Sequence, residues 1–120
     1  MLGRNKKEPE KPYREKVTVM SLINIGKLKE KINRGDDVIV LDVRSHRKFK
    51  ESHISGARSM PFDRIGKIFA SCLPRTKTLI TYSDDADCEA HMVAARELER
   101  LGHFVYAYPG GITEWKDSLS

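Results

Sequence analysis

Short apolar runs alternate along the chain with stretches in which apolar residues recur at helical spacing. The runs cover residues 17–20, 37–43, 78–82 and 104–108. The second run is apolar throughout between polar ends, which is typical of a central parallel strand that is covered on both faces. Strands alternating with helices predict an α/β, three-layer domain with a mainly parallel sheet of four to five strands and helices on both faces.

The helices have recognisable start and stop residues. Ser21 is expected to cap a helix that carries Leu28 and Ile32 and ends at Gly35. A short polar helix is expected over 46–52, a second over 62–72, and a third from about residue 88 to Gly102. The two glycines at 110–111 predict a tight turn before a last short helix, and Trp115 is expected to pack this helix against the core.

The amino-terminal segment differs in composition from the rest. Residues 1–14 are polar, contain Pro9 and Pro12, and show no apolar periodicity. We therefore expect a flexible basic tail over 1–14 and one domain over 15–120. Residues 1–16 hold six basic and three acidic side chains, so they supply three of the five net positive charges.

Composition narrows the class of protein. Basic and acidic residues are interspersed along the helices, so no nucleic-acid surface is expected. No apolar segment is long enough for a signal peptide or a membrane span, and two cysteines, Cys72 and Cys88, are too few for a disulfide scaffold. We expect a cytoplasmic monomer or weak dimer without metal or cofactor, although a trimmed leader or neighbouring domain stays open.

Two blocks of residues together resemble the rhodanese family. The first is Leu-Asp-Val-Arg at 41–44, followed by Ser-His-Ile-Ser-Gly-Ala at 52–57 and Met-Pro at 60–61. The second runs from Thr-Tyr at 81–82, through Ala-Ala-Arg-Glu-Leu at 94–98, to Tyr-Pro-Gly-Gly-Ile-Thr-Glu-Trp at 108–115. The landmarks follow in register over about residues 17–117, and the resemblance implies a rhodanese-like fold related to sulfur transfer.

The loop at residues 83–88 departs from this family at the position that matters most. Its spacing is similar to that of the branch whose loop reads C-x4-C, in which the first cysteine follows the strand tyrosine and carries a persulfide. That position is a serine here, whereas the second cysteine is kept. The loop reads Ser83, Asp84, Asp85, Ala86, Asp87 and Cys88.

The chemistry of sulfur transfer makes this departure consequential. A sulfur carrier attacks as a thiolate and holds the transferred atom through an S–S bond, which a serine oxygen cannot form. Serine is also a poor nucleophile without a hydrogen-bonded base, and the loop contains neither histidine nor lysine. The three aspartates are expected to repel thiosulfate and to raise the pKa of a nearby thiol. Weak or absent transfer from thiosulfate is predicted.

Residues around the loop are assigned supporting or structural roles. Cys88 is expected in the first helical turn, capped by Asp87, with a packing role favoured over a reactive thiol. His91 lies one turn further on and is expected to face solvent. The resemblance implies that Asp42 and Arg44 organise the pocket floor.

The resemblance also places His53 in the family's H-I-x-G-A turn, where a hydrogen bond from its ring is expected to fix the turn.

Two functional hypotheses remain. The leading one is a binding or regulatory module, deficient in thiosulfate sulfur transfer, that takes a protein partner. The alternative is an active sulfurtransferase that uses a small sulfur donor, with the persulfide on Cys88 or with Ser83 as an engineered replacement of a native cysteine. A related phosphatase of the Cys-x5-Arg type is disfavoured, because the loop contains no arginine.

Overall fold

The computed structural model describes residues 21–35, 37–66 and 71–120, in which four parallel strands form one sheet. The strands are β1 (Val38–Asp42), β2 (Arg58–Ser59), β3 (Thr78–Tyr82) and β4 (Phe104–Ala107), and their order in the sheet is β2-β1-β3-β4. Leu22 adds an isolated parallel bridge to Ala107 at the free edge of β4. The predicted α/β class and parallel sheet are confirmed.

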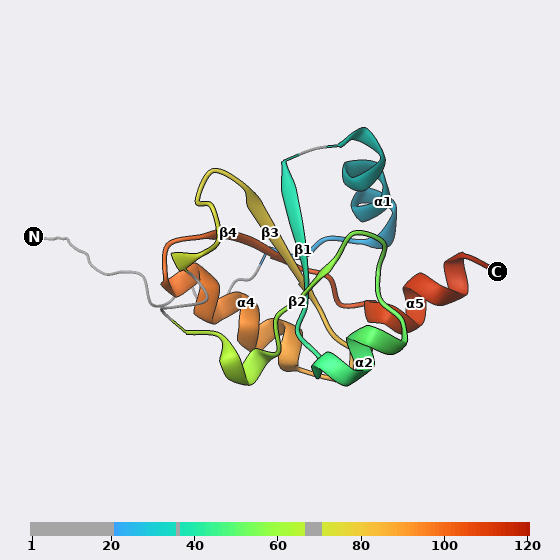
Figure 1. Cartoon of the computed structure of the whole chain (residues 1–120). Helices are drawn as coiled ribbons and strands as arrows, with labels where there is room; N and C mark the ends of the chain where they lie inside the picture. Colours follow the sequence, from blue (N-terminus) through green and yellow to red (C-terminus); the bar gives the residue numbers. More distant parts are fainter. Residues whose placement is uncertain (1–20, 36, 67–70) are drawn as a thin grey trace, which may run out of the picture.

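Helices cover both faces of this sheet (Figure 1). On one face lie α1 (Ile25–Arg34) and α5 (Gly111–Ser118), together with the short α2 (His46–Glu51). The other face is covered by α4 (Ala90–Arg100), near the short 3-10 helix η2 (Phe62–Arg64). Among the described residues, no helix has both the length and the apolarity that crossing a membrane requires.

Alternation along the strands divides the core into two clusters. Val40, Ile80 and Tyr82 point to the α1 and α5 face, where they meet Leu28 and Trp115. The other face gathers a second buried set from β1, β3, β4 and α4: Ile39, Leu41, Leu79, Val105, Ala107, Ala95 and Leu98. Burying both faces in this way fixes the register of the strands, because a slip of one residue would exchange the two faces.

Two predicted boundaries are wrong. The cap of α1 is Asn24, whose side chain accepts a hydrogen bond from the Lys27 amide at 2.8 Å, and not Ser21. The helix predicted over 62–72 is interrupted, because Ile65 adopts an extended conformation directly after η2. The predicted tail and the strand at 17–20 lie outside the described residues, as do residues 67–70.

Candidate functional site

The predicted functional residues gather at the carboxyl edge of the sheet, after β1 and β3. These strands are adjacent and parallel, and Asp42 at the end of β1 pairs in register with Tyr82 at the end of β3. The segments that leave the two strands, from Val43 and from Ser83, therefore run side by side. Ligands of open α/β sheets usually bind in crevices at this edge.

Asp42 anchors the floor of the site. Its carboxylate is fully buried and accepts hydrogen bonds from the Arg44 side chain at 2.7 to 3.2 Å and from the Tyr82 hydroxyl at 2.6 Å. Arg44 also donates to the Ser52 carbonyl, and the Tyr82 hydroxyl accepts from the Ile54 amide. The resulting network links β1, β3 and the turn at 52–57. Burial of the Tyr82 hydroxyl raises the pKa of Tyr82.

His53 lies in the same turn and stacks on Phe49 of α2. The ring centroids are 3.9 Å apart, and the His53 Nδ1 is 2.8 Å from the Phe49 carbonyl oxygen. The hydrogen bond expected of this histidine is therefore present, and it joins α2 to the turn rather than to the loop at 83–88. His53 does not contact Ser83 or Cys88 through any hydrogen bond of the described residues.

Ser83 is held in a buried hydrogen-bonded pair with a histidine. Its Oγ lies 3.1 Å from Nδ1 of His91 and 3.2 Å from the carbonyl oxygen of Cys88, and Ser83 is only 1% exposed. The hydroxyl has one proton to donate. When it donates to the Cys88 carbonyl, it must accept a hydrogen bond from a protonated Nδ1 of His91.

This pair overturns one expectation from the sequence. His91 was expected to face solvent, but it is 2% exposed and lies on the buried stripe of α4 with Ala94 and Leu98. The sequence offered Ser83 no basic partner within the loop itself, which contains neither histidine nor lysine. The partner comes from the helix that follows the loop, eight residues along the chain.

Burial of His91 makes the stability of the domain depend on pH. Burial lowers the pKa of His91 in the folded chain, whereas the pKa of an unfolded histidine is about 6.5. The unfolded chain therefore binds more protons below that pH, and stability falls as the solution is acidified. We expect His91→Gln to show a smaller loss of unfolding free energy than wild type between neutral and mildly acidic pH, measured by urea titration. Equal losses in both proteins would contradict this assignment.

Asp84 is the loop carboxylate that forms ion pairs, with Lys48 and Arg44. Its Oδ2 accepts a hydrogen bond from Lys48 Nζ at 2.9 Å, and its Oδ1 lies 3.6 Å from Arg44 Nη1. The hydrogen bond to Asp84 raises the pKa of Lys48. The sequence predicted three uncompensated carboxylates around Ser83, and this is wrong for Asp84.

The remaining loop residues form a turn before α4. The Asp85 carboxylate accepts a hydrogen bond from the Asp87 amide at 3.0 Å, and the Cys88 amide donates to the Asp85 carbonyl. The helix starts at Ala90 with Glu89 as its cap, so Asp87 is not the cap and Cys88 lies before the first turn. Cys88 is half-buried and is not part of a disulfide.

The start of α5 is joined to the same loop by backbone hydrogen bonds. The amides of Ile112 and Thr113 donate to the carbonyls of Ser83 and Asp84 at 3.0 and 3.1 Å. Gly111 makes this approach possible. It has a φ of 67°, and a Cβ at this position would lie 2.5 Å from the Ser83 carbonyl oxygen and 2.6 Å from that of Asp84.

Gly111→Ala is expected to lower the free energy of unfolding by at least about 2 kcal/mol, because a left-handed conformation and a backbone clash combine. Gly35→Ala is the matched control. Gly35 has a φ of 70°, but nothing lies within 4 Å of an added Cβ, so only about 1 kcal/mol is expected. Urea denaturation followed by circular dichroism measures both. Equal effects would show that the approach of an added Cβ to the loop carbonyls does not lower the free energy of unfolding.

Comparison with known proteins agrees with this architecture. A profile of the Rhodanese-like domain family matches residues 24–118, so the chain belongs to that family. Its fold is thus related to that of sulfurtransferases. No curated protein matches the chain significantly.

Solved structures of similar chains share this fold. The BH2092 protein of Bacillus halodurans is 30% identical, with a TM-score of 0.80 over 88% of this chain and 78% of that one. The rhodanese-like domain of Alr3790 from Anabaena is 25% identical, with a TM-score of 0.72 over 81% and 74% of the two chains. The human single-domain sulfurtransferase TSTD1 shares the fold at 18% identity and a TM-score of 0.70, over 82% and 97%.

Proposed function

We propose that this rhodanese-like domain acts as a binding or regulatory module that does not transfer sulfur from thiosulfate. One observation carries the proposal: Ser83 occupies the position at which the family branch that the loop resembles has its persulfide cysteine. An alkoxide oxygen cannot form or hold the S–S bond on which the transfer depends.

The surroundings of Ser83 support this proposal over serine chemistry. A serine with a hydrogen-bonded histidine can act as a nucleophile when its Oγ reaches a substrate. Here the Ser83 hydroxyl donates to the Cys88 carbonyl oxygen, so Nδ1 of His91 carries the proton of the second hydrogen bond and cannot act as the base. The His91 contact therefore favours a structural pair that holds the loop in shape for a protein partner.

Mass spectrometry of the intact protein tests the proposal. The wild-type chain is incubated with thiosulfate and, separately, with a persulfide donor, and the mass is searched for one added sulfur atom, about 32 Da. We expect no adduct with thiosulfate. An adduct that persists in Cys88→Ala would lie on the exposed Cys72, outside the loop, and an adduct lost in that variant would contradict the proposal and establish Cys88 as the carrier.

That second outcome corresponds to the alternative function, a sulfurtransferase that uses Cys88. The favouring observation is electrostatic, since Lys48 and Arg44 both lie beside Asp84 and offset its negative charge in the loop that ends at Cys88. A loop carboxylate without its cation would disfavour a thiolate, which is the reactive form of cysteine, and Lys48 removes that obstacle at Asp84. Lys48→Gln should then reduce the rate at which Cys88 is labelled by the persulfide donor, whereas the inactive module shows no such labelling.

A further inference from the structure

A hollow lies at the carboxyl edge of the sheet, after β1 and β2 rather than after β3. Its volume is about 540 Å³, a size typical of small-molecule sites. It is built from the connection that follows β1, from β2, and from η2. The residues that line it are Ser45, His46, Ser59, Pro61, Asp63 and Arg64, and none of them belongs to the loop at 83–88.

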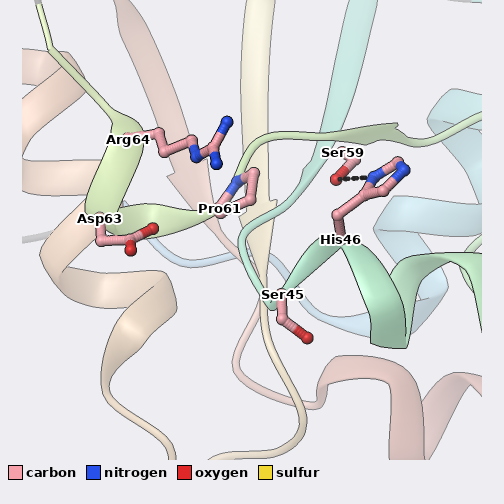
Figure 2. A pocket seen from close by; sticks show the side chains of 6 residues that line it. All are labelled: Ser45, His46, Ser59, Pro61, Asp63 and Arg64. Atoms are coloured by element: carbon pink, nitrogen blue, oxygen red, sulfur yellow. Dashed lines mark hydrogen bonds between the residues drawn. The ribbon is translucent and has the colours of Figure 1, made fainter.

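Figure 2 shows how the polar groups are arranged. His46 and Ser59 lie together on one side, with Nδ1 of His46 3.1 Å from Oγ of Ser59, and Arg64 extends toward them from η2 across Pro61. The Asp63 carboxylate also comes from η2. Within residues 21–35, 37–66 and 71–120, neither Arg64 nor Asp63 forms an ion pair or a side-chain hydrogen bond with the protein.

The donors in this hollow suit an oxyanion. Arg64 offers a planar fork of N–H groups that matches phosphate geometry, and the Ser59 hydroxyl can donate while it accepts from His46. A carboxylate presents two acceptor oxygens, whereas a phosphate presents three, so the phosphate uses more of these donors. The volume far exceeds that of a bare phosphate, which leaves room for an organic part of the ligand.

Asp63 sets the chemistry of that organic part. Its carboxylate repels a second anion but accepts hydrogen bonds from hydroxyl groups. We propose that the hollow binds a small phosphate monoester that carries hydroxyl groups, with the phosphate at Arg64 and Ser59 and a hydroxyl at Asp63. This inference goes beyond the proposed function, because it concerns different residues and needs no sulfur chemistry.

The test is a titration of the isotope-labelled full chain, followed by NMR, with glycerol 3-phosphate, inorganic phosphate and glycerol as three separate probes. We expect glycerol 3-phosphate to shift the signals of residues 45–46 and 59–64 and to bind more tightly than the other two probes. Arg64→Gln should weaken its binding about tenfold, since a charge-assisted hydrogen-bonded pair is lost. Arg96→Gln, an exposed arginine on α4, is the control and should bind as wild type does.

Asp63→Asn separates the two halves of the proposal. Removing the negative charge should tighten the binding of inorganic phosphate. The ratio of the affinity for glycerol 3-phosphate to the affinity for inorganic phosphate should therefore fall. Equal affinities of the wild-type chain for these two probes would overturn the assignment of Asp63. Shifts confined to other parts of the protein, or equal effects of Arg64→Gln and Arg96→Gln, would overturn the site itself.

Discussion

Ser83→Cys is expected to gain the ability to carry sulfur, from no detectable adduct to one sulfur atom on most chains. The new thiol would replace an oxygen that lies at hydrogen-bonding distance from Nδ1 of His91. A protonated Nδ1 would donate to a thiolate at this position and stabilise it. Asp84, which the sequence alone places against a thiolate, is already paired with Lys48 and Arg44.

Intact mass after incubation with thiosulfate, and after incubation with a persulfide donor, measures this gain. Ser83→Ala is the matched control, because it alters the same buried position without supplying a thiol. The variant Ser83→Cys/Cys88→Ala separates the two loop thiols and should keep the adduct, while Ser83→Ala reports any labelling of Cys72. If Ser83→Cys stays unlabelled by both donors, the scaffold lacks more than its nucleophile, and Asp85→Asn and Asp87→Asn would be the next variants.

Arg44→Met is expected to destabilise the domain strongly, by about 3 kcal/mol, because it leaves a buried carboxylate without its cation. The Asp42 side chain is fully buried and the Arg44 side chain is 7% exposed. The substitution also removes the hydrogen bond to the Ser52 carbonyl. Urea denaturation followed by circular dichroism measures the loss.

Lys48→Met is the matched control for this prediction. Lys48 and Arg44 both contact Asp84, but Lys48 is half exposed and does not reach Asp42. Its replacement should leave stability close to that of wild type. Asp42→Asn/Arg44→Met should recover part of the loss, since a neutral amide replaces the unpaired charge. Equal losses in Arg44→Met and Lys48→Met would show that the buried pair contributes little.

Local patterns predicted most of the framework. The run at 78–82 became β3 with the same bounds, and Gly35 ends α1 in the left-handed conformation expected of it. These features depend on a few neighbouring residues, so one sequence is sufficient to predict them. The sequence does not distinguish Asn24 from Ser21 as the cap of α1, because both residue types are good caps, and only the bridge of Leu22 to β4 shows where the helix begins.

The site was less predictable, for two physical reasons. His91 precedes Ala94 by three residues and Leu98 by seven, so its position on the buried stripe was visible in the spacing. Its polarity argued for solvent, but the Ser83 hydroxyl satisfies the ring inside the protein. The pairing of Lys48 with Asp84 had no such signal, because 36 residues separate them and only the adjacency of β1 and β3 brings them together.

The contacts between α5 and the loop have a consequence for how this domain can change. Ile112 and Thr113 bind carbonyl oxygens of residues 83 and 84, and these contacts are indifferent to which side chain residue 83 carries. A lineage could therefore exchange cysteine and serine at this position in either direction without dismantling the loop. The side chain at residue 83 can thus change without altering these backbone contacts, whereas a Cβ at Gly111 would clash with the same loop whichever side chain residue 83 carries.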